Sequence, residues 1–190
     1  MKETADPWIR IGAIAGLIGA GFFSMMWIVA VIMDGHWVLG DQTLSELGGY
    51  RPGSIYFNSG AILEGVLSLI FAYGLWQSMK KSTVQRIGGL LLLCASCFLI
   101  LVGVFPITTG LPHTIASYGF FGLALAATIL LVRPLWNERG FGPIAGTMTV
   151  VAVVVSLAFL VLTNVELTEA VSVICLLVWS SVLSVMMLRR

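Results

Sequence analysis

Charged residues are what this sequence lacks most. Only 10% of its 190 residues are Asp, Glu, Lys or Arg, whereas 58% are hydrophobic, and the mean hydropathy is +1.01. Soluble domains carry about 25% charged residues, so a chain this apolar could not cover itself with a water-compatible surface. The scarcity of charge therefore excludes a soluble domain and indicates a membrane protein. The length fits a single domain, residues 1–190.

The sequence also lacks an excess of basic residues and a cysteine framework. Its net charge of +1 excludes the basic face that a nucleic-acid partner would require. Its three cysteines, Cys94, Cys97 and Cys175, all lie in apolar runs. Cys94 and Cys97 form a C-x-x-C pair, but no second ligand pair follows it. We interpret the cysteines as small apolar residues of helices, and we predict no metal site and no cofactor.

Long hydrophobic runs fill most of the chain. Six segments contain the ~20 apolar residues that a helix needs to cross a membrane core of ~30 Å. They are Trp8–Met33, Ile55–Met79, Val84–Val104, Pro112–Val132, Pro143–Thr163 and Thr168–Leu188. The first run is too long for the core of a signal peptide, and its Gly12 and Gly16 favour close packing against another helix. The sequence thus predicts an all-α bundle of six transmembrane helices.

Basic residues predict the orientation of this bundle. With six spans, nine of the ten basic residues fall on the side of the two termini, and only Arg51 falls on the other side. The nine are Lys2, Arg10, Lys80, Lys81, Arg86, Arg133, Arg139, Arg189 and Arg190. Because basic residues are retained on the cytoplasmic side, we predict that both termini are cytoplasmic. We expect the protein to be a multi-pass protein of the cell membrane.

The longest polar interruption is residues 41–58, which the predicted orientation places outside. Thr43 followed by Glu46 is a capping-box pattern, and two glycines follow it. This pattern predicts a short helix near 43–47 on the outer rim, with Leu44 and Leu47 facing inward. At the start of the next span, Asn58 is expected to hydrogen-bond the backbone of this loop.

Glu64 is the most informative polar residue at membrane depth. It lies nine residues into the second span, about 13 Å deep. An acid at this depth is costly and faces the interior of a bundle. Gly60 and Ser68 lie one helical turn to either side, so small and polar positions form one stripe. Two interpretations remain open: an internal polar or proton-linked site, and a structural hydrogen bond between helices.

Catalytic arrangements have weaker support. His113 opens the fourth span on the outer side, and His36 lies in the outer loop. Together with the outer acids they show no recognised metal-ligand spacing, and a haem held by two histidines would require His36 inside the bundle. Ser45 lacks the G-x-S-x-G context, so its pairing with His113 as nucleophile and base rests on location alone.

Several short motifs resemble those of a known family. They are Ser45-Glu46-Leu47-Gly48, Pro52, Phe57-Asn58, Gly103-Val104-Phe105-Pro106 and His113 followed by Ala116. In this order they resemble a prokaryotic family of small six-span membrane proteins with no assigned function, over nearly the whole chain. The resemblance implies the six-span fold and no particular chemistry.

A second resemblance is to damage-regulated autophagy modulators and GPI-anchor lipid-remodelling proteins. These six-span proteins also carry a serine–acid–glycine loop before the second span and a histidine in the fourth. That resemblance implies lipid handling. The positions to which it points are Ser45, Glu46, Gly48, Pro52, Asn58 and His113.

The leading functional hypothesis is a membrane protein that binds or handles lipid in an outward-facing polar pocket. The expected pocket residues are Asp41, Ser45, Glu46, Arg51, Asn58, Glu64 and His113. Arg51 and His113 would meet an anionic head group, and Glu46 would orient one of them. Three alternatives remain: a lipid hydrolase or transferase using His113 with Ser45 or a metal, a transporter using Glu64, and a purely structural role for every polar group. The sequence determines neither the substrate nor the oligomeric state, and it allows a homo-oligomer.

Overall fold

Six long helices and two short 3-10 helices make up the regular structure. The computed structural model describes residues 6–79, 82–138 and 140–189. The long helices are α1 (Pro7–Asp34), α2 (Ser54–Ser78), α3 (Thr83–Val104), α4 (Leu111–Asn137), α5 (Gly142–Leu162) and α6 (Val165–Leu188). The 3-10 helices are η1 (Leu44–Gly48) and η2 (Ile107–Thr109). All six long helices are long and apolar enough to cross a membrane, so the predicted all-α six-span architecture is confirmed.

The sequence placed two helix ends wrongly. α4 continues to Asn137, through Arg133 and Pro134, beyond the predicted end of the fourth span at Val132. Pro134 lacks a donor, but it lies near the helix end, and the next residue, Leu135, is completely buried in the core. α6 begins at Val165 rather than Thr168, because Asn164 caps it by accepting a hydrogen bond from the Leu167 amide.

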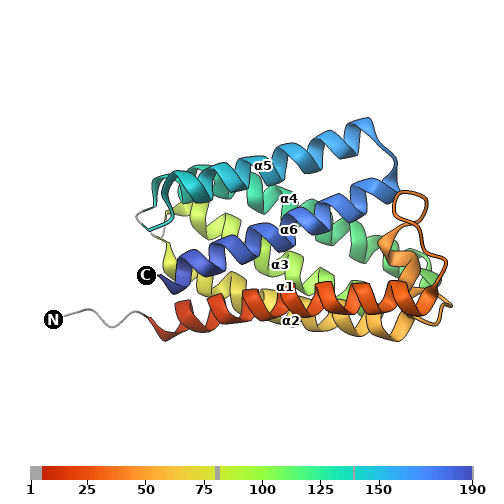
Figure 1. Ribbon diagram of the computed structural model, residues 1–190. Helices are drawn as coiled ribbons and strands as arrows, with labels where there is room; N and C mark the ends of the chain where they lie inside the picture. Colours follow the sequence, from red (N-terminus) through yellow and green to blue (C-terminus); the bar gives the residue numbers. More distant parts are fainter. Residues whose placement is uncertain (1–5, 80–81, 139, 190) are drawn as a thin grey trace.

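The helices form a ring in chain order. Each long helix packs against the next, and α6 packs against α1 to close the ring (Figure 1). α1 begins and α6 ends at one end of the bundle, whereas η1 and η2 lie at the other end (Figure 1). The ring therefore has an interior that several helices can line together.

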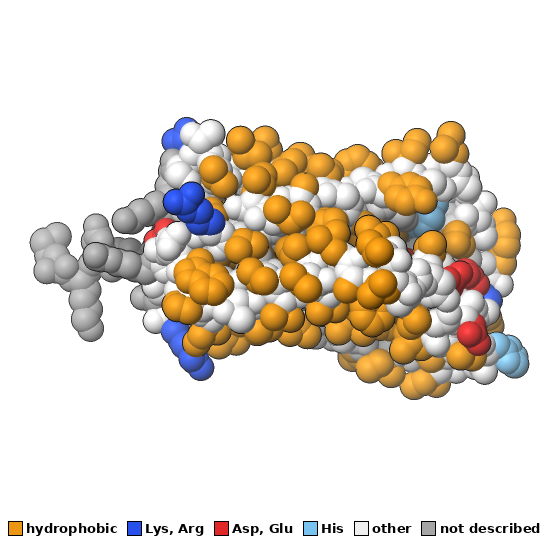
Figure 2. Space-filling model, turned by 90° about the horizontal axis from the view of Figure 1, so that it is seen from above, with side chains coloured by type: hydrophobic (Ala, Val, Ile, Leu, Met, Phe, Trp, Pro, Cys, Tyr) orange, Lys and Arg blue, Asp and Glu red, His pale blue; other side chains and the backbone are white. Residues whose placement is uncertain are grey.

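On the face drawn in Figure 2, the charged side chains gather at the two ends of the bundle. Figure 2 shows hydrophobic side chains over the middle, most Lys and Arg side chains at one end, and most acidic and histidine side chains at the other. The predicted topology agrees with this separation, although the assignment of the basic end to the cytoplasm stays a prediction. Of the nine residues on which it depends, Lys2, Lys80, Lys81, Arg139 and Arg190 lie outside the described residues.

A close helix contact joins α1 and α2. A Cβ added at Gly12 would lie 2.7 Å from the Gly74 Cα and 3.0 Å from the Ile70 carbonyl oxygen. Real Cβ atoms do not approach backbone atoms so closely, and small residues are what allow helices to come together in a membrane. The close packing predicted from Gly12 is confirmed.

Replacing Gly12 by alanine should destabilise the fold. The added methyl group would have to push α1 away from α2, at a cost of about 1–3 kcal/mol. Thermal unfolding in detergent should show a lower midpoint for Gly12→Ala than for the wild type. Gly21→Ala on the same helix is the control, because a Cβ there meets no atom within 4 Å. Equal midpoints for the two variants would contradict the tight contact.

The predicted rim helix is η1. The Thr43 hydroxyl accepts a hydrogen bond from the Glu46 amide, and the Glu46 carboxyl accepts one from the Thr43 amide, both at 3.2 Å. Leu44 and Leu47 are 1% and 0% exposed, so both point into the bundle. The capping box and the inward-facing leucines are confirmed, and η1 closes the end of the ring opposite the termini.

Candidate functional site

An ion-pair cluster holds the loop between α1 and α2. The Arg51 guanidinium lies 2.9 Å from the Asp34 carboxylate and 3.6 Å from that of Glu46. Asp34 is the closer partner, and its side chain is only 3% exposed. Arg51 is therefore balanced by two acids of its own chain. Sequence reasoning expected Glu46 to orient either Arg51 or His113, and it missed Asp34, which follows the predicted end of the first span directly.

A second link joins η1 to α6. The Ser45 hydroxyl donates to the Glu169 carboxylate at 2.5 Å, and the Ser45 amide donates to the same oxygen at 3.2 Å. Sequence reasoning counted Glu169 only as an outer acid. Apolar residues are spread around α6, so the spacing of hydrophobic residues in the sequence did not indicate that the Glu169 side chain points toward the loop. Glu169 is 124 positions from Ser45 in the sequence. This link therefore fastens η1, which we call the cap of the bundle, to α6.

Ser45→Ala should loosen the cap. The change removes the shorter of the two hydrogen bonds to Glu169 and should cost about 1–3 kcal/mol, the usual effect of leaving a polar group without its partner. Hydrogen–deuterium exchange should become at least about fivefold faster at the amides of residues 44–48. Ser59→Ala is the matched control, since that hydroxyl bonds only within its own helix, to Ile55 and Tyr56. Unchanged exchange in Ser45→Ala would show that the link does not hold the cap.

The remaining outer polar residues either hydrogen-bond within the chain or are exposed. The Asn58 amide donates to the Gly48 carbonyl at 2.9 Å, which confirms the expected bond to the loop backbone. Asp41 is exposed in the loop. The outer polar residues thus bind mainly one another and the backbone.

His113 is buried and engaged through both ring nitrogens. Its Nδ1 lies 2.7 Å from the Phe105 carbonyl oxygen, and its Nε2 lies 3.1 Å from the Ser117 hydroxyl. Since a carbonyl can only accept, Nδ1 carries a proton and donates it. Ser45 bonds Glu169 instead, so the structure does not form the Ser45–His113 pair. Among the described residues, no three His, Cys, Asp or Glu side chains are grouped closely enough to hold a metal ion.

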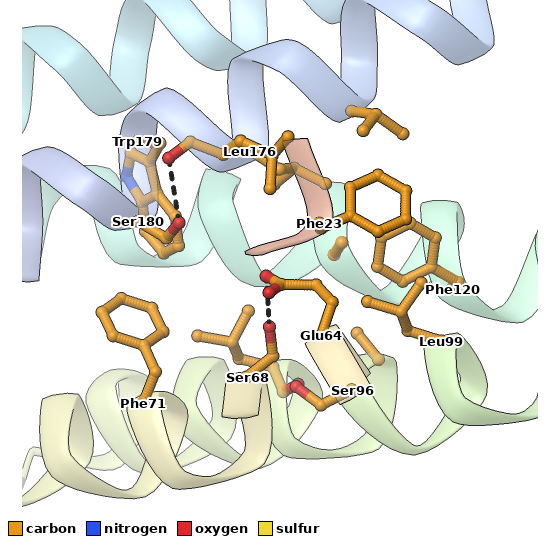
Figure 3. A pocket seen from close by; sticks show the side chains of 15 residues that line it. Phe23, Glu64, Ser68, Phe71, Ser96, Leu99, Phe120, Leu176, Trp179 and Ser180 are labelled. Atoms are coloured by element: carbon orange, nitrogen blue, oxygen red, sulfur yellow. Dashed lines mark hydrogen bonds between the residues drawn. The ribbon is translucent and has the colours of Figure 1, made fainter. Parts of the chain in front are cut away.

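A cavity lies deeper, inside the ring. This space, the Glu64 cavity, has a volume of about 70 Å³ and is lined by residues of α1, α2, α3, α4 and α6. Its walls are mostly apolar, as Figure 3 shows for Phe23, Phe71, Leu99, Phe120 and Leu176. The polar side chains at its edge are Glu64, Ser68, Ser96, Ser180 and Trp179.

Glu64, a residue of the cavity wall, has one unpartnered carboxyl oxygen, Oε2, which lies against Gly19 of α1. The residue is 7% exposed, and its Oε1 accepts a hydrogen bond of 3.0 Å from the Ser68 hydroxyl. Figure 3 shows the carboxyl pointing from α2 toward the space below Leu176. Three buried side-chain N or O atoms of the described residues lack a partner, and only Glu64 Oε2 belongs to a residue of the cavity wall. The inward orientation predicted for Glu64 is confirmed.

A smaller space leads from the Glu64 cavity toward the cap. It measures about 20 Å³ and is lined by residues that include Leu44 of η1, Ser117 of α4 and Glu169 of α6. The two spaces share four wall residues: Phe23, Leu99, Phe120 and Val173. They therefore adjoin, and together they run from the middle of α2 to the underside of η1.

The structure separates the residues that the sequence grouped into one outer pocket. Glu64 lines the deep cavity, whereas Asp41, Ser45, Glu46, Arg51, Asn58 and His113 line neither of the two spaces. Sequence reasoning did not find the wall of the Glu64 cavity. Its residues come from five helices and are mostly apolar, so no local pattern marks them.

Comparison with known proteins tests the two resemblances. The profile of a family described as "Protein of unknown function (DUF998)" matches residues 17–186, a range that reaches from α1 to α6. No curated protein and no solved structure matches the chain. The resemblance to autophagy modulators and lipid-remodelling proteins thus receives no support from these comparisons. The first resemblance is confirmed: this six-helix membrane protein belongs to the DUF998 family.

Proposed function

We propose that this protein binds a lipid-like amphiphile inside the membrane, with the polar head of the amphiphile at Glu64. The observation that carries the proposal is the unpartnered Oε2 of Glu64, a buried residue in the wall of the Glu64 cavity. A buried oxygen without a hydrogen bond costs about 1–3 kcal/mol, and more when it is charged. A bound molecule that donates a hydrogen bond to Oε2 removes this cost, so the site favours occupation.

The walls and the size of the cavity support an amphiphile with a small head. A volume of about 70 Å³ is several times the ~10–15 Å³ that one water molecule needs on the same measure. This space accepts a small head group with its first carbon atoms. The adjoining smaller space and the apolar walls offer the hydrocarbon chain a path toward the cap.

The polar residues at the outer end serve a different purpose, which is to close the bundle. Arg51 is neutralised by Asp34 and Glu46, and both nitrogens of His113 have partners within the chain. An anionic head group would have to displace these partners to bind there. We therefore place the site at Glu64 rather than at Arg51 and His113.

The transporter alternative gains no support from helix geometry. Transporters build their central sites from discontinuous helices whose ends point at the substrate. In the described residues, each of the six spans is one continuous helix. The Glu64 cavity lies between intact helices, which suits a binding site.

Native mass spectrometry of the purified protein tests the proposal. The wild type should retain a co-purified amphiphile, and Glu64→Leu should lower its occupancy at least tenfold, because leucine has a similar shape and no acceptor. Asp41→Asn is the control, since Asp41 is exposed in the loop and lines neither space. Equal occupancy in the wild type and Glu64→Leu would overturn the proposal.

A further inference from the structure

The hydrogen-bond donors around the Glu64 cavity are all in use. The Ser68 hydroxyl donates to Glu64, and the Ser96 and Ser180 hydroxyls donate to the carbonyls of Leu92 and Leu177. The indole of Trp179 donates to the Thr149 hydroxyl at 2.9 Å. A hydroxyl that has donated its hydrogen retains only acceptor capacity. With Glu64 ionised, the capacity that remains at the cavity wall is therefore that of acceptors, the serine hydroxyl oxygens and Glu64 Oε2, because the Trp179 N–H is already used.

Among the described residues, no basic side chain lines the cavity to attract an anion. A phosphate or carboxylate head has only acceptors when ionised, so it would face the Glu64 carboxylate without any donor to bind. An ammonium head has three donors and no acceptor, which is the complement of this wall. Its positive charge would also neutralise Glu64, as a charged group at membrane depth requires.

We propose that the Glu64 cavity selects single-chain amphiphiles that carry a primary ammonium head. One N–H donates to Glu64 Oε2, and the lone pairs of the wall hydroxyls surround the head. Quaternary ammonium heads are excluded because they carry no N–H to donate to Glu64 Oε2. This inference rests on the proposed binding function and adds the chemical class of the head group.

Thermal unfolding with three probes of equal chain length tests the selection. The probes are octylamine, 1-octanol and sodium octanoate, each added to the purified full-length protein in a nonionic detergent. We expect octylamine to raise the unfolding midpoint of the wild type at a concentration at least tenfold lower than 1-octanol, and octanoate to have no effect. In Glu64→Leu, none of the three should raise the midpoint, and this variant corrects for partitioning of the probes into the micelle.

Glu64→Gln provides a second variant that retains shape and polarity. It exchanges a carboxylate oxygen for an amide nitrogen with two donors. We expect it to lose the preference for octylamine by at least tenfold while it folds like the wild type.

The outcomes separate the two proposals. If 1-octanol or octanoate acts at the same or a lower concentration than octylamine, and Glu64→Leu abolishes the effect, the ammonium selectivity is wrong while the binding site stands. If octylamine keeps its full advantage in Glu64→Gln, the selectivity is equally wrong. If no probe distinguishes the wild type from Glu64→Leu, both the selectivity and the proposed binding function fail.

Discussion

Replacing Ala124 by leucine should abolish amphiphile binding without unfolding the protein. Ala124 is buried in α4 and lines the Glu64 cavity. Leucine adds three carbon atoms to a space of about 70 Å³, so little room for a head group remains. The occupancy measured by native mass spectrometry should fall at least tenfold. Thermal stability should change by no more than the ~1–3 kcal/mol that overpacking costs.

Gly122→Leu is the matched control for this substitution. Gly122 lies on the same helix, is exposed, and has no atom within 4 Å of an added Cβ. The same side chain at this position should leave occupancy unchanged. If Ala124→Leu retained the amphiphile as well as Gly122→Leu does, the molecule would have to bind elsewhere.

Arg51→Ala should be the most destabilising change in the outer loop. It leaves the carboxylate of Asp34, whose side chain is 3% exposed, with the His36 amide at 3.3 Å as its remaining contact. Removing one partner of a buried ion pair costs about 3–5 kcal/mol. Because Arg51 itself is 26% exposed, we expect the lower end, about 3 kcal/mol. Thermal or denaturant unfolding in detergent should show this loss.

A double-mutant cycle identifies the cause. Asp34→Asn removes the charge that Arg51 balances, so Asp34→Asn combined with Arg51→Ala should be more stable than Arg51→Ala alone. Residues in direct contact show coupling energies of about 0.5–3 kcal/mol. Additive effects of the two substitutions would mean that the pair does not stabilise the loop.

The six helices could be predicted because each span is long, apolar and separated from the next by polar residues. The ends of α4 and α6 were misplaced because they depend on local packing and capping. Leu135 is buried beyond Pro134, and Asn164 caps α6 ahead of the main apolar run. The composition of the segments does not reveal either contact. The capping box of η1 could be predicted because Thr43 and Glu46 are close in sequence.

The site was only partly predictable. Glu64 could be found because an acid at membrane depth has few explanations. Asp34 and Glu169 were missed as partners because their bonds join residues that are distant in sequence. The concentration of polar residues in 41–58 suggested a pocket there. In the structure those residues mainly bind one another and close the bundle, because polar groups that are buried under the loop need internal partners.

Photocrosslinking is the most direct test of whether the ligand lies in the Glu64 cavity. The probe is an octylamine derivative with a diazirine in its chain, applied to the purified protein with and without excess unlabelled octylamine. We expect competable labelling of peptides that carry the shared wall residues Phe23, Leu99, Phe120 and Val173, and loss of this labelling in Glu64→Leu. Competable labelling confined to residues 35–53 and unchanged in Glu64→Leu would contradict an intramembrane site and place binding at the outer loop.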